Sequence, residues 1–151
     1  MSTAIAERSW RVVVPHHARG ARLARHRLAA ELGEAISASL LADAIAVLAE
    51  LVGNAIRHAD PLPGDVVRVA WWLRGDEQHE TVTVQVTDGG AGDRTPVMRA
   101  AGADAVDGRG LRIVVALADH WGVERDGLGQ TVWAQLHAER SEDNAESNCL
   151  A

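Results

Sequence analysis

Three polar side chains that could bind a metal or move a proton recur at helical spacing in the middle of the chain. Glu50, Asn54 and His58 stand four residues apart, so a helix would place them on one face. The amide oxygen of Asn54 is a hard ligand suited to Mg²⁺, an ion that keeps waters and bridges phosphates. The carboxylate of Glu50 could accept a proton from a water or a hydroxyl. The spacing indicates metal-assisted phosphate chemistry, or else a solvated helix face with a local Glu–Asn hydrogen bond.

A second motif, Asp88-Gly89-Gly90-Ala91-Gly92, follows an alternating segment at 81–88. By that alternation Asp88 points to the same side as the valines of the segment, towards the core. A buried carboxylate is costly unless something pairs with it, and the sequence shows no nearby cation. The amino group of adenine is a candidate partner, and Gly90 and Gly92 would let a base approach the backbone closely. The alternative is a simple Asp-Gly turn.

A third motif, Gly108-Arg109-Gly110-Leu111, precedes an apolar segment at 111–118. A glycine turn that leads into a helix presents free N–H groups and the positive end of the helix dipole. Such a site suits a phosphate chain, and Arg109 or Arg112 could add positive charge. Glycine pairs mark many loops, so the weight of this motif comes from its order after the other two.

These motifs need particular elements to position them. The apolar periodicity predicts helices at 18–32, 40–59 and 111–118, and strands at 10–14, 66–74, 81–88, 121–125 and 131–137. We expect an α+β fold, a two-layer α/β sandwich with helices on one face of a mixed, mostly antiparallel sheet. One domain would span 9–138, with flexible tails at 1–8 and 139–151.

Helical spacing also predicts which residues of the two long helices are buried. In the first helix Leu23 and Leu28 would face the core, with the arginines on the wet side. In the second helix the predicted buried stripe consists of Leu41, Ile45, Leu48, Val52 and Ala55.

The composition excludes several classes of protein. The 151 residues fit one compact domain, and the net charge of −6 argues against nucleic acid as the main ligand. No secretory signal is visible, and we expect no membrane span. The single cysteine, Cys149, has no internal partner, which also favours the cytoplasm. Lysine is absent, so arginines, backbone amides and a metal would have to serve any phosphate.

The three motifs, in this order, resemble the ATP-binding domain shared by gyrase, Hsp90, histidine kinases and the MutL mismatch-repair proteins. This is the GHKL family, with the Bergerat fold. Within it the phrases 50–59 and 129–136 resemble most the bacterial anti-sigma-factor serine/threonine kinases, in which one such domain stands alone. A threonine often helps to hold the base near the last strand of these relatives. Here the alternation of the last strand predicts that Gln130 points towards the core and could take this role. Thr131, its neighbour, is the alternative.

The resemblance implies ATP and Mg²⁺ as cofactors and a serine or threonine of a partner protein as phosphoryl acceptor. Glu50 would be the catalytic base, Asn54 would hold Mg²⁺, and Asp88 would recognise adenine. The residues implied to contact the nucleotide are Asn54, His58, Asp88, Gly90, Gly92, Gly108, Arg109, Gly110 and Leu111, with loop 93–107 as a lid.

The implied partners are a sigma factor and an anti-anti-sigma protein of the STAS type, and a homodimer is possible. The first alternative is a catalytically weak binding module, in which ATP sets partner affinity without phosphoryl transfer. The second is the ATPase subunit of a larger assembly.

Overall fold

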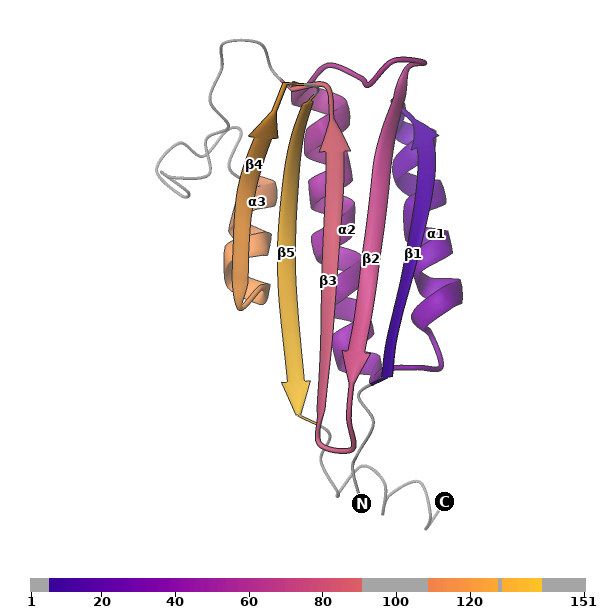
Figure 1. Cartoon of the computed structure of the whole chain (residues 1–151), viewed down its shortest axis with the longest axis vertical. Helices are drawn as coiled ribbons and strands as arrows, with labels where there is room; N and C mark the ends of the chain where they lie inside the picture. The colour runs from indigo at the N-terminus through magenta and orange to yellow at the C-terminus, as the bar shows by residue number, and fades with distance from the viewer. Residues whose placement is uncertain (1–5, 91–108, 128, 140–151) are drawn as a thin grey trace.

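The computed structural model describes residues 6–90, 109–127 and 129–139. These residues form a five-stranded sheet with the order β1-β2-β3-β5-β4, in which every pairing is antiparallel. The described helices all lie behind the same face of the sheet, so the molecule has two layers (Figure 1). The strands are β1 (Ala6–Pro15), β2 (Val66–Gly75), β3 (His79–Asp88), β4 (His120–Asp126) and β5 (Gly129–Glu139). The helices are α1 (Ala18–Leu32), α2 (Ala38–His58) and α3 (Arg109–Leu117).

The predicted two-layer α+β sandwich is therefore confirmed. The expectation of a mixed sheet allowed for a parallel pair, and none occurs among the described strands. Two of the pairings, β2 with β3 and β4 with β5, join consecutive strands through short turns. The turn between β2 and β3 is closed by Asp76, whose carboxylate accepts hydrogen bonds from the N–H groups of Gln78 and His79, both at 2.7 Å.

The core lies between the sheet and the helices because each inner strand turns its apolar side chains to the same face. In β2 the side chains of Val67, Val69 and Trp71 are fully buried. The intervening Arg68 is exposed on the other face. This period-two pattern is the one predicted from the sequence, and none of the described helices covers the other face of the sheet.

Helix α1 has the predicted bounds but one wrong core assignment. Leu28 is fully buried as expected, whereas Leu23 is 49% exposed. The buried position one turn before Leu28 is Ala24, because residues four apart lie on the same helix face. Leu23 is rotated by about 100° from Ala24 and so shares the solvent side with the arginines.

Helix α2 is the central element of the core, and the predicted stripe was right for its second half. Leu48, Val52 and Ala55 are buried. Leu41 and Ile45 are only partly buried at the border of the stripe. The helix faces the sheet with a slightly rotated set of positions, which are Leu40, Ala44, Val47, Leu48, Leu51, Val52, Gly53 and Ala55.

By length and composition α2 is also the one described helix that could cross a membrane. The sequence analysis had predicted no segment of this kind. Val47, Leu48 and Val52 are fully covered by the rest of the fold, so the apolar character of α2 is that of a core helix. Its N-terminus is capped by Ser37, whose hydroxyl accepts a hydrogen bond from Leu40 N–H at 3.2 Å.

The ends of several elements differ from the predicted ones. Strand β1 begins at Ala6, before the predicted start at Trp10, and β5 continues to Glu139. Helix α3 begins at Arg109, two positions before Leu111. The predicted domain of 9–138 and its tails, 1–8 and 139–151, stay a prediction, since most of the tail residues lie outside the described part of the chain.

Candidate functional site

The first two motifs meet at one end of the sheet, where β3 ends beside the end of α2 (Figure 1). The backbone of Asp60, just after α2, makes two hydrogen bonds with the glycines that follow β3. Asp60 N–H donates to Gly90 O at 2.8 Å, and Gly89 N–H donates to Asp60 O at 2.7 Å. This reciprocal pair fixes the turn after Asp88 to the end of the helix that carries Glu50 and Asn54.

His16, at the end of β1, joins the same corner. Its Nε2 lies 3.0 Å from Ala55 O and 2.9 Å from Ala59 O, two carbonyl oxygens in and beyond the last turn of α2. Since both neighbours are acceptors, Nε2 must carry the proton. Ala55 O also accepts from Ala59 N–H at 3.2 Å, whereas Ala59 O, beyond the last turn of the helix, takes its donor from His16. The sequence interpretation gave His16 no role, although a histidine directly after a strand-ending proline could have marked it.

Asp88 is buried on the core side, as the strand parity predicted, with 3% of its surface exposed. Its Oδ1 accepts a hydrogen bond from Gly90 N–H at 2.7 Å. Among the described residues, no group donates to its Oδ2. Burial raises the pKa of Asp88, whereas the Gly90 hydrogen bond and the charge of His16 lower it. The nearby carboxylate of Asp60 raises it further. His16 thus acts electrostatically on Asp88 from a distant part of the sequence, which the sequence did not reveal.

Three glycines shape the backbone around Asp88. Gly90 has φ +84°, a left-handed conformation that suits glycine. A Cβ on Gly89 would stand 2.3 Å from Pro61 O, and one on Gly129 would stand 2.2 Å from Asp88 O. Gly89 and Gly129 are therefore needed where two backbones touch, and the sequence interpretation gave no such role to either. Gly90 was expected to let a base approach, which stays a prediction; no described atom lies within 4 Å of its Cβ position.

Of the two candidates on the last strand, only Gln130 shares a face with Asp88. The two residues are direct partners in the register of β3 and β5, and Gln130 is 6% exposed. Its Oε1 accepts a hydrogen bond from Arg125 Nε at 3.3 Å. Thr131 lies on the opposite face, where its hydroxyl bonds to that of Thr87 at 2.8 Å.

The polar face of α2 holds Glu50 and Asn54, both half-buried. No described side chain makes a hydrogen bond or ion pair with Glu50. Asn54 Oδ1 accepts a hydrogen bond from Arg57 Nη2 at 3.1 Å. The Glu50–Asn54 hydrogen bond, which belonged to the alternative of a solvated helix face, is absent from the described contacts, and Arg57 is the partner of Asn54 instead. His58, the last residue of α2, is exposed.

The third motif is only partly described. Arg109 and Gly110 form the first turn of α3 instead of a turn before it, and Leu111 follows within the helix. Strand β4 runs towards the Asp88 end of the sheet, and α3 runs alongside it in the opposite direction (Figure 1), so α3 begins on the side of Asp88. Gly92, Gly108 and the predicted lid 93–107 lie outside the described residues.

The described residues fit a magnesium ion that is held mainly by a nucleotide. They contain no group of three or more His, Cys, Asp or Glu side chains that could hold a metal alone. Asn54 instead offers one amide oxygen on a half-buried helix face, with Glu50 one turn away. Mg²⁺ is typically bound in this way, through one or two protein oxygens plus phosphates and waters.

Comparison with known proteins gives one family and one fold. The model of the histidine kinase-like ATPase domain matches residues 14–136. A similar solved structure is "The crystal structure of the RsbU and RsbW domains of Rv1364c from Mycobacterium tuberculosis", with a TM-score of 0.67 and 22% identity. The match covers 89% of this chain but 33% of that one, so this chain spans about a third of its length. At this identity the likeness concerns the fold alone. The comparison with curated proteins gives no match.

Proposed function

Because the chain belongs to the family of histidine kinase-like ATPase domains, we propose that it binds ATP and transfers the γ-phosphoryl group to a serine or threonine of a partner protein. An ATP-binding domain is what the family implies. The observation that supports the finer proposal is the attachment of α2, the helix that bears Glu50 and Asn54, to the turn that follows Asp88. There the end of α2 is hydrogen-bonded to the turn after β3.

In this proposal Asp88 recognises the base. Gly90 N–H occupies Oδ1 at 2.7 Å and holds the carboxylate in place. Oδ2 is left to accept a hydrogen bond from the amino group of adenine. A buried carboxylate held in one orientation suits recognition of a single donor group of a ligand. Gln130, directly opposite Asp88 in the strand register, lies on the same side.

The phosphates would extend from this base towards α2 and α3. Asn54 would hold Mg²⁺, which when bound offsets the charge of the phosphate oxygens. Backbone N–H groups at the start of α3 suit phosphate binding. We propose His58, Gly90, Gly92, Gly108, Arg109, Gly110 and Leu111 as the remaining nucleotide contacts, with 93–107 as the lid.

Glu50 would then act as the general base. The hydroxyl oxygen of the acceptor forms a bond to the γ-phosphorus as the bond from that phosphorus to the β–γ bridging oxygen breaks. The hydroxyl proton passes to the Glu50 carboxylate, and ADP leaves with the electron pair of the broken bond. A half-buried carboxylate suits this role, since no described group competes for its oxygens.

The phrases 50–59 and 129–136 support a role as an anti-sigma factor in the cytoplasm, through their resemblance to the kinases of that class. The phosphoryl acceptor would be an anti-anti-sigma protein of the STAS type, and a sigma factor would be the competing partner. A homodimer belongs to the same proposal.

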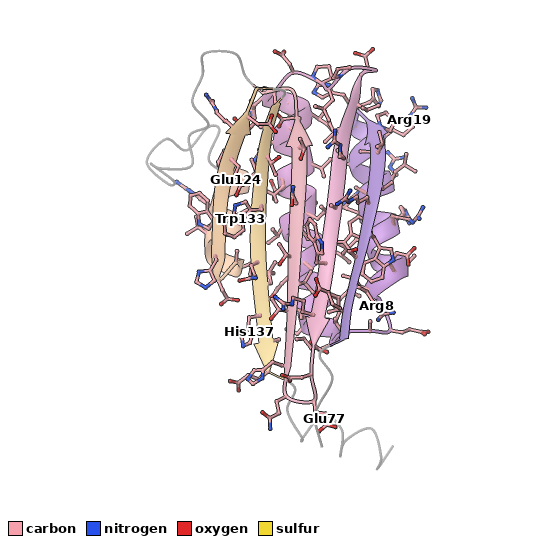
Figure 2. The ribbon with its side chains drawn as sticks, in the orientation of Figure 1. Arg8, Arg19, Glu77, Glu124, Trp133 and His137 are labelled. Atoms are coloured by element: carbon pink, nitrogen blue, oxygen red, sulfur yellow. The ribbon has the colours of Figure 1, made fainter. Side chains whose placement is uncertain are left out.

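Phosphoryl transfer can be tested directly. The purified chain is mixed with Mg²⁺, ATP labelled at the γ position and a candidate anti-anti-sigma protein. We expect label on the partner, and its loss in the Glu50→Ala variant. The matched control is Glu77→Ala, because Glu77 lies in the exposed turn at the far end of the sheet (Figure 2).

The alternative function predicts a different result from the same experiment. A binding module would bind ATP and a partner protein with affinities that differ between ATP and ADP, while no label reaches any partner. Equal loss of label in the Glu50→Ala and Glu77→Ala variants would also contradict Glu50 as the base.

A further inference from the structure

One contact in the site places a positive charge on the atom that would bind the metal. Arg57 Nη2 donates to Asn54 Oδ1 across 3.1 Å, within one turn of α2. The Asn54 oxygen is the amide ligand assigned to Mg²⁺ in the proposed function, on which this inference rests. A divalent ion on that oxygen would come close to the guanidinium, and like charges repel in inverse proportion to their separation.

Gly53 makes this contact possible. Gly53 is buried, and a Cβ built on it would stand 2.9 Å from Arg57 Nη1 and 3.4 Å from both Cζ and Nη2. These three atoms are the nearest neighbours of that position, so the guanidinium lies over the bare Cα. Any larger residue at position 53 would push the guanidinium away from the helix surface.

We infer that Arg57 is a resident cation on Asn54 Oδ1 that Mg²⁺ must displace, and that Gly53 admits it. Arg57 thereby sets the magnesium concentration at which the nucleotide site loads. With its metal ligand satisfied by Arg57, the nucleotide-free protein has less tendency to take up Mg²⁺ alone. Mg²⁺ then binds together with the nucleotide phosphates, because their negative charge exceeds the positive charge of the guanidinium.

The inference predicts a change in magnesium dependence instead of a uniform change in nucleotide affinity. ADP, which excludes turnover, is titrated calorimetrically into the protein at a series of free Mg²⁺ concentrations. We expect Arg57→Gln to lower the Mg²⁺ concentration of half-maximal effect by about two- to fivefold, the range of an exposed charged contact. Gly53→Ala should shift it in the same direction, although it leaves Arg57 in the chain.

The double variant makes the test specific. If Gly53→Ala acts by displacing the guanidinium, the Gly53→Ala, Arg57→Gln variant should match Arg57→Gln alone. The charge-matched control is Arg74→Gln. Arg74 pairs with Thr81 in the register, at the end of the sheet remote from Asp88, and should leave the magnesium dependence unchanged. Alanine also favours helix over glycine, so Gly53→Ala should fold.

The outcomes separate this inference from the proposed function. No heat with ADP or ATP at any Mg²⁺ concentration in the unmodified protein would overturn both. Normal nucleotide binding with the same magnesium midpoint in all variants would overturn the inference alone. A loss of ADP affinity in Arg57→Gln that is equal at every Mg²⁺ concentration would also overturn it.

Discussion

The imidazole of His16 donates to the carbonyl oxygen of Ala59 across 2.9 Å and so joins the end of β1 to the end of α2. The same Nε2 reaches Ala55 O at 3.0 Å, and the backbone N–H of His16 donates to Asp65 O at 2.9 Å. His16 also acts electrostatically on Asp88. One side chain therefore links the helix that bears Glu50 and Asn54 to the strand that ends in Asp88.

Replacing His16 should weaken the link between the two halves of the site, which the backbone bonds of Asp60 still join. In His16→Leu the Ala59 carbonyl loses its donor, and we expect unfolding to become easier by about 1 kcal/mol. His16→Gln keeps an N–H donor at similar reach and should recover most of that loss. ATP affinity should follow the same order, with His16→Leu weaker than His16→Gln. Urea denaturation and calorimetry measure the two effects. Equal behaviour of the two variants would contradict a hydrogen-bonding role for the imidazole.

The Asp88→Asn variant tests whether Asp88 recognises the adenine base. Asn keeps an oxygen for Gly90 N–H but presents an N–H₂ group where the ligand would donate. We expect ATP affinity to fall by about 1–3 kcal/mol, the value of a lost charge-assisted hydrogen bond together with an unsatisfied donor. GTP lacks the amino group at that position and should lose less. Unchanged ATP affinity would refute the role.

The same substitution has the opposite effect on the ligand-free fold at neutral pH. The pKa of Asp88 is raised from 3.8, first by burial. Its contribution to stability is fully present below 3.8 and is lost as the pH rises through the higher folded value. Asp88→Asn removes this loss, so its free energy of unfolding, relative to the unmodified protein, should rise between pH 4 and pH 7. A difference that is constant with pH would contradict this.

Asp76 provides the control for that pH dependence. Its pKa is lowered, first by the hydrogen bond from Gln78 N–H and then by that from His79 N–H. Its contribution is therefore present above 3.8 and lost as the pH falls through the lower folded value. The relative stability of Asp76→Asn should accordingly decrease as the pH rises, opposite in sign to Asp88→Asn. Urea denaturation at a series of pH values checks both variants.

The sequence predicted what depends on local periodicity. The bounds of α1, the buried side of β2 and the inward direction of Asp88 each follow from a spacing of 3.6 or 2 residues. The assignment of Leu23 to the core was wrong because the buried face of a helix is set by the surface against which it packs. Ala24 lies on that face, which periodicity alone could not indicate. The predicted start of α3 was wrong because glycine at position 110 lowers helix propensity but can still form part of the first turn.

The tertiary part of the site lay beyond the sequence. His16 is separated from Ala55 and Ala59 by about forty positions, and the register of β3 with β5 is what sets Gln130 opposite Asp88. Arg57 lies close to Asn54 in the sequence, but its position over Gly53 depends on how one long side chain folds back. Such long-range or rotamer-dependent contacts carry no periodic signal.

The last prediction concerns the close backbone contact between β5 and the end of β3. In Gly129→Ala the new methyl group would stand 2.2 Å from Asp88 O, and backbone cannot yield as a flexible side chain can. We expect a loss of about 1–3 kcal/mol in the free energy of unfolding, the range for overpacking, and weaker ATP binding because Asp88 moves. Gly127→Ala is the matched control in the same turn, since no atom of the described residues stands within 4 Å of its Cβ position. Chemical denaturation of the two variants measures the difference, and equal stability would show that the strands can part at Gly129 without strain.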